Sequence, residues 1–183
     1  MHKSIIVALG EVGYVEKETR EALDDKLENA GDENFTKYAR DLDSRLGFYR
    51  GLKQGMPWCD VFVDWCFVQA YGAHMARKLL CQSMFSRGAG CRYSYAYYQE
   101  AGRTVTEPAE GDQIFFVQNG TICHTGLVTG VDESYVYTVE GNTSDASGIV
   151  PNGGCVARKR YLRSDPGIVG YGRPDYALVQ EPV

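Results

Sequence analysis

Histidine is scarce in this chain, and its cysteines are not spaced as metal ligands. The three histidines are His2, His74 and His124, and the six cysteines include no Cys-x-x-Cys pair, so the sequence predicts no structural metal. Of the six, Cys81 and Cys91 flank a glycine-containing loop and are the pair we expect to be able to form a disulfide. The cysteines are Cys59, Cys66, Cys81, Cys91, Cys123 and Cys155.

The chain also has fewer basic than acidic residues, and it lacks long apolar runs. The net charge of -5 and the pI near 5.2 argue against nucleic acid or a membrane as partner, because either would need a basic face. No apolar run approaches the roughly 20 residues that cross a bilayer. The stretch from Ile5 to Leu9 is too short and too poorly flanked for a signal peptide, so we expect a soluble chain without a Sec leader.

Glycine, tyrosine and an ordinary share of hydrophobic residues are what the chain does have. It is 44% hydrophobic and 23% charged, with 21 Gly and 13 Tyr. A chain of 183 residues fits one domain, which at this size buries about 70% of its unfolded surface. Strands, turns and an aromatic surface are the expected result.

Helical spacing of apolar residues in the first half gives way to short β-rich runs in the second. Residues 16–34 are highly polar and are interpreted as a solvated loop. Helices followed by strands favour an α+β domain, with N-terminal helices packed on an antiparallel β-sheet. The expected helices cover residues 4–12, 35–46, 58–70 and 93–102, and the expected strands cover 113–117, 124–131, 135–140, 155–161 and 168–171.

Cys59 stands where a helix should begin. Pro57 suits the first turn of a helix, because its missing N–H costs nothing there. Unpaired backbone N–H groups and the helix dipole at that end favour a negative charge and lower the pKa of a thiol. One of these N–H groups can also help to hold an oxyanion. The alternative is that Cys59 is a small core residue, which is the common fate of a free cysteine.

His124 and Glu140 lie on two adjacent expected strands, at equal distances from Asp132 in the turn between them. Simple hairpin register places the two side chains opposite each other on one face, about 5 Å apart at Cβ. The same register places Asn142 opposite Ile122 on that face. A histidine alone is more often a satisfied structural residue, but nucleophile, base and orienter together are what thiol hydrolysis requires.

Four segments resemble, in order, the motifs of CHAP domains, the cysteine, histidine-dependent amidohydrolases/peptidases of the papain-like NlpC/P60 superfamily. The resemblance implies a papain-like fold and an active site of Cys59, His124, Glu140 and Asn142. It covers residues 48–176, so we expect 1–47 to be an N-terminal helical segment of the same domain and 177–183 a tail or the start of a linker. The segments are Trp58–Val63, Gly111–Phe116, His124–Val128 and Val139–Thr143, and the likeness closes with Gly170–Pro174.

The resemblance implies a peptidoglycan hydrolase that needs no cofactor. Either an endopeptidase or an N-acetylmuramoyl-L-alanine amidase would fit, as part of a phage endolysin or a bacterial autolysin. The protein would be made in the host cytoplasm and act on the wall, or be secreted with a leader outside this chain. The partner would be bacterial peptidoglycan, with a separate wall-binding domain possible beyond Val183.

Two alternatives to that function stay open. NlpC/P60 peptidases are close, but they usually place a histidine or another neutral polar residue where Glu140 stands. An inactive wall-binding or immunity module on the same fold is the alternative from a different class, and retention of all four polar positions speaks against it.

Several residues near these motifs have more than one interpretation. Some relatives bind calcium through an acidic loop before the cysteine, but Asp41 and Asp43 lack the further carboxylates and are interpreted as the solvated face of a helix. Gln54 could donate to an oxyanion, although a turn-exposed glutamine is the simpler interpretation. Four tyrosines could line a substrate groove or pack with their hydroxyls in water. They are Tyr93, Tyr95, Tyr97 and Tyr98.

Overall fold

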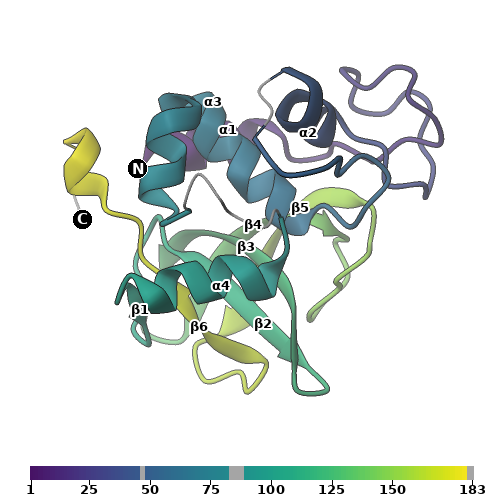
Figure 1. Ribbon diagram of the computed structural model, residues 1–183. Helices are drawn as coiled ribbons and strands as arrows, with labels where there is room; N and C mark the ends of the chain where they lie inside the picture. The colour runs from purple at the N-terminus through teal and green to yellow at the C-terminus, as the bar shows by residue number, and fades with distance from the viewer. Residues whose placement is uncertain (46–47, 83–88, 181–183) are drawn as a thin grey trace.

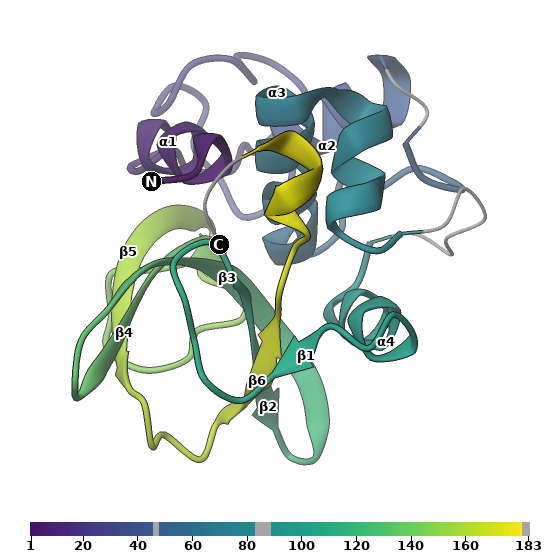
Figure 2. The ribbon, with the colours of Figure 1, turned by 90° about the vertical axis from the view of Figure 1, so that its left-hand side faces the viewer.

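The fold is an antiparallel sheet with helices above and beside it. The computed structural model describes residues 1–45, 48–82 and 89–180. Figures 1 and 2 show α1, α2 and α3 grouped above the sheet, while α4 lies against it separately. The helices are α1 (Lys3–Gly10), α2 (Lys37–Arg40), α3 (Cys59–Leu79) and α4 (Cys91–Glu100), with a π-helical turn at Asp41–Arg45 and a 3-10 turn at Tyr176–Val179.

The sheet has the strand order β1-β6-β2-β3-β4-β5, and every neighbouring pair is antiparallel. The predicted α+β class is therefore confirmed, and the five expected strands appear with ends shifted by one to three residues. The two-residue strand β1 was not expected. The strands are β1 (Thr104–Val105), β2 (Gln113–Gln118), β3 (Thr121–Val131), β4 (Tyr135–Thr143), β5 (Cys155–Leu162) and β6 (Ile168–Gly172).

Both faces of the sheet are apolar, because alternate residues of each strand point to opposite sides. Phe115, Leu127 and Val139 join the main core on the helix side. The opposite face carries a smaller cluster that includes Phe116 and Tyr161.

Helix α3 is the centre of the main core and begins at Cys59. It is buried around most of its circumference, including Asp60 and Asp64, as the sequence predicted. The expected end at Ala70 is one residue early: Gly72 has the non-helical conformation φ 76°, ψ 155°, which ends the first helical segment, and a second segment continues to Leu79.

The expected helix over 35–46 is shorter than its apolar spacing suggested. Thr36 caps α2 by accepting a hydrogen bond from the backbone N–H of Ala39 at 3.1 Å, and the chain widens into the π-helical turn after Arg40. Leu46 and Gly47 lie outside the described residues. The other two expected helices are confirmed with their starts and ends moved by one or two residues.

Asp41 and Asp43 do not form a solvated face. Asp41 is buried and accepts from the indole Nε1 of Trp65 at 3.0 Å. Asp43 accepts from the backbone N–H groups of Lys53 and Gln54 at 2.6 and 2.9 Å. The prediction failed because short carboxylates can satisfy backbone and indole donors as well as water.

The polar segment 16–34 is not a purely solvated loop. Lys17 makes bridges to Ala30 and Phe35, and both Glu16 and Lys17 are buried. The carboxylate of Glu16 accepts from the indole Nε1 of Trp58 at 2.6 Å, directly before α3. This part of the chain thus packs against the start of the central helix.

The two ends of the described chain meet. The ring of Tyr176 stacks on His2 with a centroid distance of 3.6 Å, and its hydroxyl donates to the carbonyl of Gly111 at 2.8 Å. The 3-10 turn therefore continues the packed structure past residue 176, while residues 181–183 lie outside the described part. No helix within the described ranges combines the length and apolar character that crossing a membrane requires.

Gly141 allows α3 to approach β4 closely. A Cβ at this position would lie 2.5 Å from Cβ of Phe62 and 2.8 Å from Cζ3 of Trp58. Replacing Gly141 by Ala should therefore lower the free energy of unfolding by about 1–3 kcal/mol through overpacking. Thermal and urea unfolding would measure it, with Gly130→Ala as the control, because a Cβ there meets nothing within 4 Å. Equal stability of the two variants would contradict the close packing.

Candidate functional site

Cys59 lies at the N-terminal end of α3 with only 4% of its surface exposed. Trp58, the residue that caps the helix, is fully buried. The backbone N–H of Asp60, at the same helix end, lowers the pKa of the Cys59 thiol, which is the direction that the sequence predicted.

His124 and Glu140 meet on the sheet face that carries the smaller cluster. Nε2 of His124 lies 2.9 Å from Oε2 of Glu140, and both side chains are fully buried. The carboxylate also accepts from Oγ1 of Thr138 at 2.5 Å and from the hydroxyl of Tyr161 at 3.1 Å. Glu140 is therefore held by three neighbours rather than by the histidine alone.

The predicted hairpin register is wrong, although the predicted contact is present. Leu127 pairs with Val139, which differs by two residues from a direct pairing of His124 with Glu140. Near the turn, Val131 pairs with Val136, which is three residues from the predicted register, and the bulge at Thr129 reduces the difference to two. A shift of two residues leaves each side chain on its original face, so the two groups still face the same side.

Gly126 explains how the contact is made in this register. Continuing the pairing from Leu127 and Val139 puts Gly126 opposite Glu140. A Cβ on Gly126 would lie 2.4 Å from Cγ of Glu140, so the glutamate side chain crosses the space that a side chain would fill. It thereby reaches His124 diagonally.

The Cys59 thiol and the His124 ring interact electrostatically, and each shifts the pKa of the other. Nε2 contacts Glu140, so Nδ1 is the ring nitrogen left for the thiol, and it has no hydrogen-bond partner among the described residues. The ring of Phe116 stacks beside the imidazole at a centroid distance of 5.8 Å. The imidazole is thus held by Glu140 and Phe116, with Nδ1 unpaired.

These contacts favour a thiolate and an imidazolium. Burial lowers the pKa of His124, but hydrogen bonds and charges of Cys59 and Glu140 outweigh it and raise the pKa to about 9. The pKa of Cys59 falls well below its ordinary value, first through a hydrogen bond from Cys91 and then, against the effect of burial, through His124. Burial and the charge of Glu140 raise the pKa of Tyr161, so it stays a neutral donor.

Cys81 and Cys91, the one pair considered able to form a disulfide, are not bridged. All six cysteines are free thiols, and Sγ of Cys91 lies 3.4 Å from Sγ of Cys59. Cys91 is the first residue of α4, so the start of that helix turns its thiol toward the start of α3. Spacing along the sequence did not indicate this pair, since 32 residues separate the two cysteines.

Asn142 lies near the other three residues along β4 but uses its side chain elsewhere. Its Nδ2 donates to Oδ1 of Asn34, and its Oδ1 accepts from the backbone N–H of Gly154, both at 3.4 Å. Its backbone has φ 54°, at the irregularity between Glu140 and Thr143. The side chain therefore ties β4 to the N-terminal segment, and its catalytic role stays a prediction.

Sequence reasoning missed Thr138, Tyr161, Phe116 and Cys91. The alternation of β4 could have indicated Thr138, because a residue two positions before Glu140 shares its face. Tyr161 and Phe116 come from neighbouring strands, so they depend on the pairing of the whole sheet. Gln54 is placed away from an oxyanion role, because its amide exchanges two 3.0 Å hydrogen bonds with the backbone of Thr36.

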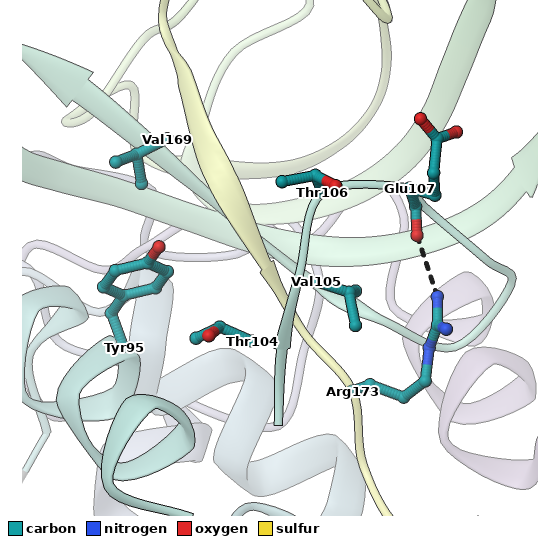
Figure 3. Close-up of a pocket in the computed structure, with 7 residues that line it drawn as sticks. All are labelled: Tyr95, Thr104, Val105, Thr106, Glu107, Val169 and Arg173. Carbon is teal, nitrogen blue, oxygen red and sulfur yellow. Dashed lines mark hydrogen bonds between the residues drawn. The ribbon is translucent and has the colours of Figure 1, made fainter. Parts of the chain in front are cut away.

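A pocket of about 430 Å³ lies beside α4, lined by none of the four predicted active-site residues. Figure 3 shows Tyr95 at one end and Arg173 with Glu107 at the other, joined by a hydrogen bond from Arg173 to the Glu107 carbonyl. Of the four tyrosines, Tyr95 thus lines a pocket, whereas Tyr98 is fully buried and packs with Phe115. Within the described ranges, no cluster of three His, Cys, Asp or Glu side chains could hold a metal ion.

Comparison with known proteins agrees with the motifs. No curated protein is similar enough to this chain to count as a match. A family model, that of the CHAP domain, matches residues 51–142, a range that includes Cys59, His124 and Glu140. The match covers half of the chain, and the chain therefore belongs to the CHAP domain family of peptidoglycan hydrolase-type amidases and peptidases.

Proposed function

We propose that this protein cleaves amide bonds of bacterial peptidoglycan, with Cys59 as nucleophile, His124 as general base and acid, and Glu140 as the group that orients the imidazole. One observation carries the proposal: the buried His124 ring is paired with the Glu140 carboxylate at 2.9 Å, and its charge interacts with that of Cys59. Nucleophile, base and orienter in that order are the arrangement that thiol hydrolysis requires.

The first half of the reaction would acylate the sulfur. The Cys59 thiolate attacks the amide carbonyl, and the helix-end backbone N–H groups are available to the oxyanion that develops. The imidazolium of His124 then gives its proton to the leaving amine, and a thioester remains on Cys59. Water attacks the thioester as His124 accepts its proton, which releases the carboxylic product and restores the Cys59 thiolate and the His124 imidazolium.

Glu140 would keep the imidazole in the tautomer and orientation that this sequence needs. Its bond to Nε2 leaves Nδ1 for the sulfur, and its charge favours the imidazolium. Thr138 and Tyr161 hold the carboxylate, so its position does not depend on substrate. Asn142 would support the cluster indirectly, by anchoring the end of β4 to Asn34.

The kind of protein that would carry this domain and the amide bond that it would cleave are also part of the proposal. An endolysin or an autolysin would both supply such a domain, acting on the wall with or without a separate wall-binding domain. We favour an endopeptidase over an N-acetylmuramoyl-L-alanine amidase, because neither the tyrosines of α4 nor the 141–148 loop resembles a sugar-specific site. An inactive wall-binding or immunity module has less support, since it would not need a thiol, an imidazole and a carboxylate together.

Cys59 should be the most reactive of the six thiols, because it combines a helix N-terminus with an imidazole. Limited iodoacetamide treatment should label it first and abolish the fall in turbidity of purified cell walls. Cys59→Ala should reduce that activity to background, whereas Cys155→Ala, which removes a half-buried thiol from another part of the sheet, should retain it. Wall hydrolysis by Cys59→Ala would overturn the mechanism.

Glu140→Gln keeps the shape of the side chain and removes its charge. Wall hydrolysis should fall on the order of a hundredfold without loss of folding, because His124 remains but is less well oriented. The imidazolium is favoured below its pKa of about 9, so activity should decline above that pH in the parent protein. Without the carboxylate the decline should begin at lower pH. A pH profile with an unchanged basic limb would assign the orienting role to another residue.

The products should carry new amino groups and no new reducing sugar ends. Acyl transfer to a thiol frees an amine first and a carboxylate second, and it leaves glycosidic bonds intact. Labelling of free amines should therefore rise as turbidity falls, while a reducing-end assay stays flat. Mass spectrometry of the fragments would tell endopeptidase from amidase by the residue that bears the new amine. New reducing ends in place of amines would mean a glycosidase.

A further inference from the structure

The Cys91 thiol is a buried nucleophilic group that the proposed mechanism does not use. It is 7% exposed, and its sulfur lies 3.4 Å from that of Cys59. Each cysteine is the first residue of its helix, α4 and α3 respectively. The two helix ends therefore converge on one pair of sulfur atoms.

Asp60 holds the two helix ends together. Its Oδ2 accepts from the backbone N–H of Gly90 at 2.7 Å and from Oγ of Ser94 at 2.8 Å, one residue before and three residues after Cys91. Its Oδ1 accepts from Nε2 of Gln113 on β2 at 3.1 Å. Asp60 follows Cys59 directly, so these three bonds fix the distance between the two thiols.

The two sulfurs share one proton, and the geometry of the contact allows either to donate it. The pKa of Cys91 is raised well above the ordinary value, first by the bond to Cys59 and then by burial. The pKa of Cys59 is lowered, first by Cys91 and also by the charge of His124. These opposite directions favour Cys91 as the donor and Cys59 as the acceptor, as in dithiol pairs where one thiol lowers the pKa of the other.

We propose that Cys91 is a positioning residue whose S–H donates a hydrogen bond to the Cys59 thiolate, holding the nucleophile ionised and aimed at His124. The inference rests on the proposed function in taking Cys59 as the nucleophile. Cys91 acts through Cys59 and forms no bond to substrate. The charge on sulfur is then held by a thiol, a backbone N–H and an imidazole from three separate elements.

The pH dependence of Cys59 alkylation tests this role without requiring wall hydrolysis. The full chain, kept reduced, is treated with iodoacetamide across a pH series, and the Cys59 peptide is quantified by mass spectrometry in the parent, Cys91→Ala, Cys91→Ser and Cys155→Ala. Loss of a hydrogen bond to a charged group should raise the apparent pKa of Cys59 in Cys91→Ala, slowing labelling at low pH by about tenfold. Cys91→Ser keeps a donor and should stay within about threefold of the parent, and Cys155→Ala should match it.

The high end of the pH series separates access from ionisation, because Cys59 is a thiolate there in every variant. A uniform rate change at all pH values in Cys91→Ala, or an equal shift in Ala and Ser variants, would reduce Cys91 to a packing residue and overturn the inference. An unshifted profile in Cys91→Ala would do the same. Failure of the proposed function can be told apart from failure of this inference, because it would appear as wall hydrolysis by Cys59→Ala, whatever the alkylation profiles show.

Discussion

The buried contact between His124 and Glu140 is the constraint on which the rest of the site depends. An ionisable pair without solvent exposure is tolerated only where its remaining polar atoms are satisfied. This requirement accounts for the donors Thr138 and Tyr161 on the carboxylate. It also requires β3, β4 and β5 to be paired before any of these groups can meet. The electrostatics of the site therefore depend on the architecture of the sheet.

Cys59, the proposed nucleophile, comes from the opposite layer. Helix α3 brings Cys59 to the sheet, and the absence of a side chain at Gly141 lets the helix pack closely against β4. Helix α4 arrives separately, and Asp60 links its first turn to that of α3. Negative charge on the sulfur is thereby stabilised where two helices begin, while positive charge on the imidazole is stabilised by the sheet. The domain divides the two halves of an ion pair between its two layers.

The sequence predicted the fold class, five of six strands and the elements that carry Cys59, His124 and Glu140, because apolar periodicity and helix-start chemistry are local signals. It did not predict the hairpin register, since the turn is centred between Glu133 and Ser134 rather than on Asp132, and the bulge at Thr129, which partly offsets this, has no clear sequence signature. The proximity of Cys91 to Cys59 depends on how α4 packs on α3, which no local pattern encodes. The polar segment 16–34 was misjudged for a related reason: Glu16 is buried by a partner, Trp58, that lies 42 residues away.

Because the side chain of Glu140 crosses over Gly126, substitutions at these two positions should be coupled in evolution. Any side chain at 126 would compete for the volume that the glutamate occupies, so the glycine can diverge only if the carboxylate is shortened, moved or lost. The reverse does not hold, because a shorter side chain at position 140 would remove the steric reason for glycine at position 126. Among relatives, drift at position 140 should therefore precede drift at position 126. A bulky residue at 126 would mark a descendant whose orienting group comes from elsewhere in the sheet.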